Sequence, residues 1–303
     1  MKLFVTGGTG VLGRPTLPKL IAAGHEVTAI ARGAEKAAHV RAAGATPVSV
    51  DIFDPLALKD ALAGHDGVLH LATKIPPMSK AAVTSTWDEN NRIRTEGTRN
   101  LVDAAVTNGL QLVVKESISF MYADAGDAWV DEDSPIDAPG LIEPTVEGER
   151  IALSFGGEGR RAVVLRFGFF HASGAAHTEN FLKMARMHVA PAVGRPDAYQ
   201  SIIHIDDAAD AVVAVVEAPN ASGIYNVVDD EPITRHDYAR VLGDAIGKKL
   251  YLPPRALVKA GGKKTDYLMR SLRVSNRRLK GDTSWTPGHP NAAATWAEIL
   301  GHR

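Results

Sequence analysis

The sequence contains no cysteine among its 303 residues. Disulfides, thiolate metal sites and cysteine nucleophiles are therefore excluded, and this absence is typical of a protein from a reducing compartment. The chain also has no excess of charge of either sign, because 34 lysines and arginines stand against 35 aspartates and glutamates. Such a chain has no electrostatic footprint for nucleic acid or an anionic membrane. We therefore expect small-molecule partners, no metal site, no nucleic acid and no membrane.

Long hydrophobic runs are absent as well, since no apolar stretch approaches the roughly 20 residues that span a bilayer. The first residues, MKLFVTGG, run directly into a predicted strand and turn, without the apolar stretch and cleavage site of a signal peptide. We expect a cytoplasmic protein. Its length allows one large α/β domain, or a domain with a smaller lobe.

Short apolar segments alternate with helical patterns along the chain. This rhythm predicts a Rossmann-type, doubly wound parallel sheet with helices on both faces. Helices are expected over 88–106 and 208–217, with Asp206 as the N-cap of the second. Strands are expected over 3–6, 27–31, 47–51, 68–72, 111–115, 162–167 and 224–228.

The alternation breaks down twice, after residue 167 and again after Pro232, where helical patterns dominate. We predict a dinucleotide-binding domain of residues 1–167, to which 201–231 return. Residues 168–200 and 232–303 are then expected to form a smaller carboxyl-terminal substrate lobe.

The segment KLFVTGGTGVLGR places three glycines in the turn from the first strand into a helix. A side chain there would hold a pyrophosphate away from the backbone amides and the helix dipole that bind it. A lone glycine pattern is weak evidence, but the strand, turn, helix and second strand are the context that supports the motif. The alternative is that these glycines only make tight turns. The predicted cofactor contacts are Gly7, Gly8, Thr9, Gly10, Val11, Leu12, Gly13 and Arg14.

The residue after the second strand discriminates between cofactors. An acid there would bind a ribose 2'-hydroxyl, whereas a cation accommodates a 2'-phosphate. The sequence has Arg32 at this place, and Arg14 can add a second cation. We therefore predict NADP(H), with NAD(H) less favoured. The alternative is two solvated arginines.

Several motifs in this order resemble the extended short-chain dehydrogenases/reductases of the NAD-dependent epimerase/dehydratase type, over nearly the whole chain. They are TGGTGVLG at 6–13, DIFD at 51–54, VLHLAT at 68–73, EGTRNLVDAA at 96–105, LRFGFFHASG at 165–174, SIIHIDDAADAV at 201–212 and GIYNVVDDEP at 223–232.

The resemblance implies further site residues and a partner. Asp51 and Ile52 would border the adenine, and His70, Leu71, Ala72 and Thr73 would line the path toward the nicotinamide. A satisfied core histidine is the alternative for His70. The resemblance also implies a homodimer, formed through the helices at 88–108 and 145–155.

The chain departs from the family's catalytic pattern. In KESISFMYAD, Ile118 stands where the family has its catalytic serine or threonine. A shift of one residue would place Ser117 or Ser119 there, but it would give up the match of Tyr122 to the family's tyrosine. Leu141 and Thr145 stand at the positions of the family's Tyr-x-x-x-Lys pair, which normally supplies the proton. Arg94 replaces an asparagine. The chain therefore resembles an atypical member that lacks the usual proton donor.

Other residues are candidates for proton transfer. Alternation along the strand sends Lys115 and Ser117 to one side and Glu116 to the other. The candidate catalytic residues are Ser117, Tyr122, Glu116, Lys115 and His171, the last at the tyrosine of the family's Val-Tyr-Gly-Pro turn. For Lys115, Glu116 and Ser117 the alternative role is to anchor the loop 123–139 by hydrogen bonds, and for Tyr122 it is to pack the end of the strand.

The prediction for function is an NADP(H)-dependent oxidoreductase or epimerase that acts on a hydroxyl or carbonyl group of a small organic molecule. Two other classes stay open: a nucleotide-sensing or scaffold protein without redox chemistry, and a non-redox isomerase or cyclase that reuses the cofactor cleft. The apolar pocket or core of the smaller lobe is expected from Phe169, Phe170, Phe181, Met184 and Tyr199.

Overall fold

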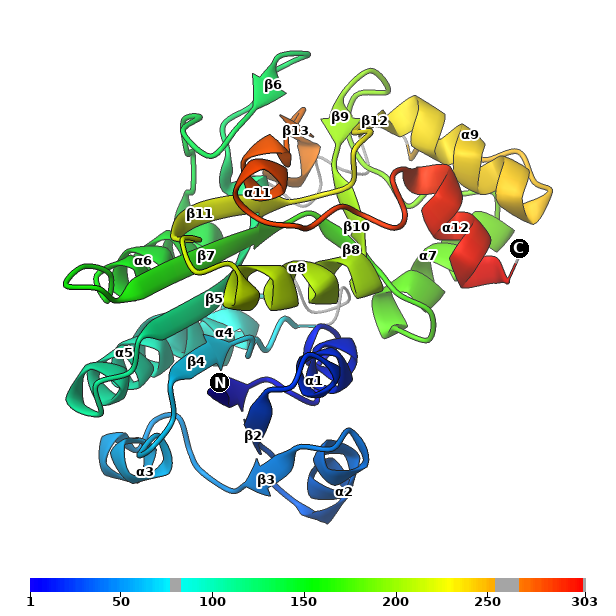
Figure 1. The fold of residues 1–303 in the computed structure, drawn as a ribbon. Helices are drawn as coiled ribbons and strands as arrows, with labels where there is room; N and C mark the ends of the chain where they lie inside the picture. Colours follow the sequence, from blue (N-terminus) through cyan, green and yellow to red (C-terminus); the bar gives the residue numbers. More distant parts are fainter. Residues whose placement is uncertain (77–82, 254–266, 302–303) are drawn as a thin grey trace.

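The computed structural model describes residues 1–76, 83–253 and 267–301, and its centre is a seven-stranded parallel sheet (Figure 1). The strand order is β11-β7-β5-β4-β1-β2-β3. The Rossmann-type, doubly wound fold predicted from the sequence is confirmed, and each of the seven predicted strands is present. They are β1 Lys2–Thr6, β2 Glu26–Ile30, β3 Thr46–Val48, β4 Gly67–His70, β5 Leu112–Ile118, β7 Arg161–Phe167 and β11 Gly223–Val227.

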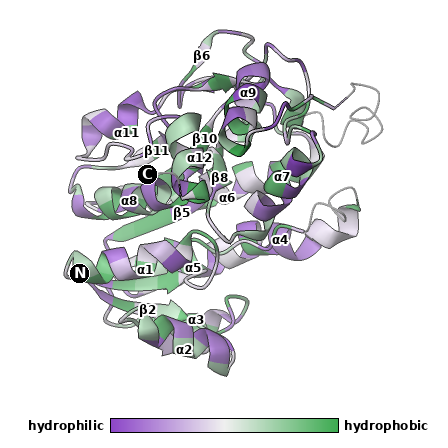
Figure 2. Cartoon of the chain, turned by 90° about the vertical axis from the view of Figure 1, so that its right-hand side faces the viewer, coloured by the Kyte–Doolittle hydropathy of each residue, from purple (hydrophilic) through white to green (hydrophobic). Residues whose placement is uncertain are grey.

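Hydrophobic side chains fill both faces of the sheet, as strands covered on two sides require. Because successive side chains point to opposite faces, Leu3 and Val5 pack on one side and Phe4 on the other. Figure 2 shows hydrophobic residues gathered in the strands and hydrophilic ones on the outer faces of the helices. The first face is covered by α1 Gly13–Ala22, α2 Ala34–Ala42 and α8 Ile205–Glu217, and the second by α3 Pro55–Ala61, α5 Thr98–Thr107 and α6 Glu143–Leu153.

The helix predicted over 88–106 is interrupted by a π turn. Gly97 lies in this turn, and a Cβ on it would be 2.8 Å from Ile52 Cδ1. On the other side of the turn, Asn90 Oδ1 accepts a hydrogen bond of 3.0 Å from Lys74 N. Tertiary contacts therefore hold both halves of the interrupted helix. Its parts are α4 Asp88–Arg92, the π turn η3 Ile93–Gly97 and α5.

Three helices pack around a further hydrophobic cluster beyond the carboxyl edge of the sheet (Figure 1). The cluster includes Leu182, Leu242 and Trp296, so both segments predicted for the smaller lobe contribute to it. The predicted domain boundaries stay a prediction, and residues 254–266 and 302–303 lie outside the described residues. The helices are α7 Ala176–Arg186, α9 Arg235–Ile246 and α12 Ala292–Leu300.

Short strand pairs and turns connect this region to the sheet. The pairs are β8 Phe169–His171 with β10 Ile202–His204, β9 Tyr199–Gln200 with β12 Ile233–Thr234, and β6 Trp129–Val130 with β13 Arg273–Val274. The remaining elements are η2 Thr84–Trp87, η4 Ser119–Met121, η5 Gly140–Ile142 and α11 Arg277–Asp282. No helix in the part of the chain that the structure describes is long and apolar enough to cross a membrane.

The N-cap predicted for α8 is wrong by two residues. His204 is the N-cap, and its Nδ1 accepts from Asp206 N at 3.3 Å, so Asp206 lies in the first turn. The next residue, Asp207, accepts from the backbone amides of Gly288 and His289, each at 2.9 Å. Asp207 therefore binds a distant segment. Both acids lie in the first turn, where the helix dipole favours a negative charge, and neither of them caps the helix.

Candidate active site

The glycine turn lies at the carboxyl ends of β1 and β4. Gly7 has φ +77°, and a Cβ there would lie 2.5 Å from the carbonyl carbon of Leu71 and 2.6 Å from Ala72 N. A Cβ on Gly13 would lie 2.2 Å from Gly7 O. The structure thus brings the predicted segments 7–14 and 71–73 together. Since the strand order changes direction between β1 and β4, this is the crevice where open α/β sheets bind ligands.

The predicted cation for a 2'-phosphate lies at the same edge of the sheet. Arg32 follows the end of β2 and is exposed, and it makes no ion pair within the described residues. Ala31 N donates to Val48 O at 2.9 Å, which keeps Arg32 beside the chain that leads from β3 to Asp51. Arg14 is also exposed, and its Nε donates to Thr9 O at 3.1 Å.

His70 is buried beside this crevice with both ring nitrogens in contact with polar atoms. Nδ1 lies 2.7 Å from Thr6 Oγ1, and Nε2 lies 3.3 Å from Ile93 O. Burial, and after it the charge of Lys115, holds the pKa of His70 well below its usual value. His70 therefore has the geometry of a core histidine whose two ring nitrogens both have polar partners, which is the alternative role named for it from the sequence.

The three polar residues at the end of β5 are buried and turn toward the helices. Ser117 Oγ donates to Glu149 Oε1 at 2.5 Å, and a Cβ on Gly148 would lie 2.9 Å from Lys115 Cε. Lys115 and Ser117 therefore both face α6, as the predicted alternation requires. Glu116 reaches Arg94 of the π turn instead.

The loop 123–139 is anchored by other residues. Asn226 N donates to Glu132 Oε1 at 2.8 Å, and Asp137 N donates to Met121 O at 2.9 Å. Arg270 Nη1 donates to Tyr122 O at 2.9 Å and also binds Asp137. Anchoring of the loop therefore does not account for the polar end of β5.

A buried chain of hydrogen bonds runs from Ser117 across the sheet. Arg166, on β7, donates to both carboxylate oxygens of Glu149, from Nε at 2.9 Å and from Nη2 at 2.6 Å. Arg166 Nη1 donates to Tyr122 OH at 2.9 Å, and Tyr122 OH donates to Asn226 Oδ1 at 2.7 Å. Burial raises the pKa of Tyr122 to about 12, although Arg166 opposes the shift. The phenol is a fixed part of the interior.

Arg166 and Asn226 were missed by the sequence reasoning. The signal for Arg166 was present, because it is a lone charge in the apolar run that becomes β7. A charge at such a position requires a buried partner. Asn226 carried no such signal.

Arg94 and Glu116 form a second, looser ion pair. Arg94 Nη2 lies 3.4 Å from Glu116 Oε1, and Nη1 lies 3.4 Å from Oε2. Both side chains are buried, and within the described residues Arg94 Nη1 and Glu116 Oε2 have no hydrogen-bond partner. Lys115, the neighbour of this pair, is fully buried, and its Nζ donates to Glu116 O at 3.3 Å. Burial, with a further contribution from Arg94, lowers the pKa of Lys115 to about 8.

His171 lies in the hydrophobic interior near α9 and α12. Its Nδ1 lies 3.0 Å from Phe169 O, which can only accept, so this nitrogen carries the proton. Nε2 then accepts from Tyr238 OH at 2.7 Å. The ring also packs edge-on against Trp296, and burial lowers the pKa of His171 to about 4. The structure therefore separates His171 from the residues at the end of β5.

Aromatic side chains border the ends of β5 and β7. The rings of Phe120 and Phe169 stack 4.3 Å apart, and both are half-buried. Ile118, which was matched from the sequence to the family's catalytic hydroxyl, is also half-buried. Phe181 packs against the cluster around Trp296. Phe169 packs against the same cluster, so of these two predicted apolar residues it alone also contacts Phe120 at the end of β5.

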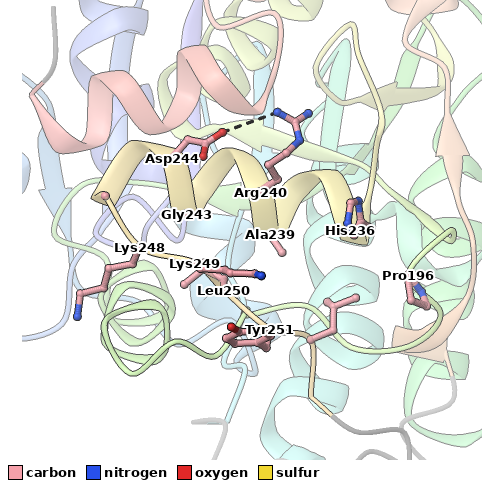
Figure 3. Close-up of a pocket in the computed structure, with 12 residues that line it drawn as sticks. Pro196, His236, Ala239, Arg240, Gly243, Asp244, Lys248, Lys249, Leu250 and Tyr251 are labelled. Atoms are coloured by element: carbon pink, nitrogen blue, oxygen red, sulfur yellow. Dashed lines mark ion pairs between the residues drawn. The ribbon is translucent and has the colours of Figure 1, made fainter.

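A hollow of about 730 Å³ lies elsewhere, along α9 and the chain that follows it (Figure 3). Its lining includes His236, Arg240, Lys249 and Tyr251, and it contains none of the predicted site residues. Within the described residues, no group of three or more histidines or acids is arranged to hold a metal ion.

Comparison with known proteins identifies the family. The 3-diazoavenalumate denitrifying reductase of a Streptomyces species is 32% identical over 99% of each chain. The 4-hydroxy-2-methyl-3-oxo-4-farnesyl-3,4-dihydroquinoline-1-oxide ketoreductase of Stigmatella aurantiaca is 28% identical over 82% of this chain and 74% of its own. The crystal structure of human epimerase family protein SDR39U1 with NADPH superimposes with a TM-score of 0.83 at 25% identity, covering 100% of both chains. The profile of the NAD dependent epimerase/dehydratase family matches residues 3–228, and the chain belongs to that family.

Proposed function

We propose that the protein is an NADP(H)-dependent oxidoreductase that acts on a carbonyl or hydroxyl group of a small organic molecule. The observation that carries the proposal is the glycine turn, which is packed against the chain after β4 so tightly that Gly7 and Gly13 admit no side chain. The helix α1 begins there without a capping side chain and without an acid in its first turn. Such a helix start suits a pyrophosphate.

Each part of the cofactor would have its own group of residues around the crevice. Gly10, Gly13 and the first turn of α1 would hold the pyrophosphate, Asp51 and Ile52 would border the adenine, and Arg32 with Arg14 would bind a 2'-phosphate. Ala72 and Thr73 would lie along the nicotinamide half. When bound, the reduced cofactor supplies a hydride. The printed names of the relatives support reduction, because two of them are a reductase and a ketoreductase, and a structural neighbour was crystallised with NADPH.

Arg32→Ala is expected to remove the preference for NADPH over NADH. A hydrogen bond to a charged group contributes about 1.5 to 3 kcal/mol, which corresponds to roughly tenfold to a hundredfold in affinity. Fluorescence titration of parent and variant with both reduced cofactors measures the ratio. Arg41→Ala, an exposed arginine on α2, is the matched control and should leave the ratio unchanged. Equal affinities in the parent, or the same ratio in Arg32→Ala, would contradict the prediction.

The reaction itself is tested by NADPH oxidation with a panel of ketones and aldehydes. A protein that binds NADPH and oxidises it with none of them would instead be a nucleotide sensor. That second candidate has one specific observation in its favour, because Leu141 and Thr145 carry no group able to replace the family's tyrosine and lysine.

The proposed homodimer would pair α5 and α6 with their copies. Their outer faces hold ion pairs within one chain: Arg99 with Glu147 at 3.3 Å, and Arg150 with Glu147 at 2.7 Å. Val106, which is 45% exposed, supplies apolar surface on α5. We expect a dimer mass by light scattering at micromolar concentration. A monomer mass would count against this interface.

A further inference from the structure

The ammonium group of Lys115 uses only one of its hydrogen-bond donors within the described residues. An ammonium group has three, and the contact from Nζ to Glu116 O, at 3.3 Å, is the one hydrogen bond that Lys115 makes within the described residues. The side chain is fully buried. A buried cation that is incompletely hydrogen-bonded is costly to the fold, so this lysine needs a reason other than stability.

The other candidate proton donors already take part in hydrogen bonds or ion pairs inside the protein. Ser117 donates its hydroxyl proton to Glu149, and Tyr122 donates its own to Asn226. His171 is enclosed near α9 and α12, where Tyr238 donates to its Nε2. Glu116 forms an ion pair with Arg94. Within the part of the chain that the structure describes, Lys115 is therefore the candidate whose acidic protons lack acceptors.

The position of Lys115 relates it to the cofactor crevice. In the sheet, Lys115 of β5 pairs with His70 of β4. His70 is followed by Leu71 and Ala72, whose backbone touches the glycine turn. Lys115 is therefore one strand away from the chain that would lie along the nicotinamide. We propose that Lys115 Nζ is the proton donor of the reduction, in place of the absent tyrosine; this inference rests on the proposed function.

The step balances in atoms and charge. Hydride from the reduced cofactor forms a new C–H bond at the substrate carbonyl carbon, and the electron pair of the C=O π bond moves to oxygen. Lys115 Nζ gives one proton to that oxygen, directly or through a water, and becomes a neutral amine. Solvent then restores the proton. A donor whose pKa lies near 8 suits this transfer at neutral pH.

Four groups interact electrostatically with Lys115: His70 on β4, Arg94 in the π turn, Glu116 beside it on β5, and Glu149 on α6. Burial and, after it, Arg94 lower the pKa of Lys115, while Glu116 and Glu149 raise it. The rate of carbonyl reduction should be constant at low pH and should fall as Lys115 loses its proton, near pH 8. Arg94→Gln should move this fall to higher pH and Glu116→Gln to lower pH, each by about one unit.

Lys115→Met tests the donor directly. Turnover should fall at least about tenfold, the Kd for NADPH should stay within about threefold, and the Tm should not decrease, because a buried cation is removed. Lys115→Arg keeps a cation that does not release its proton and should lose turnover equally. Lys59→Met, an exposed position on α3, is the control that should behave like the parent.

A readout without cofactor or substrate completes the experiment. NMR titration of the lysine ε-carbons in the free protein should show one signal with a midpoint near pH 8, absent in Lys115→Met. A parent-like turnover in Lys115→Met, or no signal titrating below pH 9.5, roughly a unit under an ordinary lysine, would overturn the inference while leaving the reductase intact. A parent that oxidises NADPH with no carbonyl would overturn the proposed function, and the inference with it.

Discussion

Replacing Arg166 with methionine is expected to lower the free energy of unfolding by about 3 to 5 kcal/mol. Arg166 is 2% exposed and donates to both oxygens of Glu149, which is 3% exposed. Its removal leaves a buried carboxylate whose remaining hydrogen bond comes from Ser117, together with a Tyr122 hydroxyl that has lost one donor. Urea unfolding at neutral pH measures the change.

The exposed ion pairs supply the control for this prediction. Arg150→Met breaks a pair with Glu147 on the surface of α6, where solvent screens the charges, and should leave the urea midpoint close to that of the parent. The double variant Arg166→Met, Glu149→Gln removes both buried charges and should be more stable than Arg166→Met alone. If Arg166→Met and Arg150→Met unfold at the same urea concentration, the interior ion pair does not have the role assigned to it.

Gly13→Ala is expected to weaken NADPH binding by at least about a hundredfold, which corresponds to roughly 2.7 kcal/mol. The new Cβ would lie 2.2 Å from Gly7 O and 2.6 Å from Gly8 Cα. Both are backbone atoms, so the turn itself must open, and the amides that would bind the pyrophosphate move apart. Fluorescence titration with NADPH measures the loss.

Gly24→Ala is the matched control for Gly13→Ala. Gly24 has φ +84° at the end of α1, and a Cβ on it would have no atom within 4 Å. Alanine there should cost stability of about 1 to 2 kcal/mol through backbone strain and leave NADPH affinity unchanged. Parent-like affinity in Gly13→Ala would show that the turn does not hold the nucleotide.

The sheet could be predicted from the sequence because its signals are local. Strands buried on both faces are short apolar runs, and each of the seven lies within a few residues of its predicted place. The π turn could not be predicted, because the residues 88–106 alone have an ordinary helical pattern, and the close approach of Gly97 to Ile52 appears only in the fold. Asp206 suits an N-cap by its residue type, whereas the helix begins earlier, after His204.

In the candidate site, too, some features could be predicted from the sequence and others could not. The glycine turn and Arg32 could be found because they follow their strands directly. The partners of the polar residues could not, because they come from distant strands and helices: Tyr122 bonds to Asn226, 104 residues away, and His171 to Tyr238, 67 residues away. Only the folded sheet shows that Ser117 donates to Glu149 and Tyr122 to Asn226, whereas Lys115 makes a single hydrogen bond within the described residues.

The π turn at Ile93–Gly97 has a consequence for how this chain and its relatives can diverge. A π turn closes hydrogen bonds between residues five apart, so it holds one residue more than an α-helical turn, and each residue advances a helix by about 100°. Deletion of one residue here would restore a regular helix and leave α5 packed on α3 and α6. It would also swing α4 by about that angle, carrying Asn90 away from Lys74. A single-residue deletion at this place would therefore separate Asn90 from Lys74, and it would also change the turn that contacts His70 and Glu116.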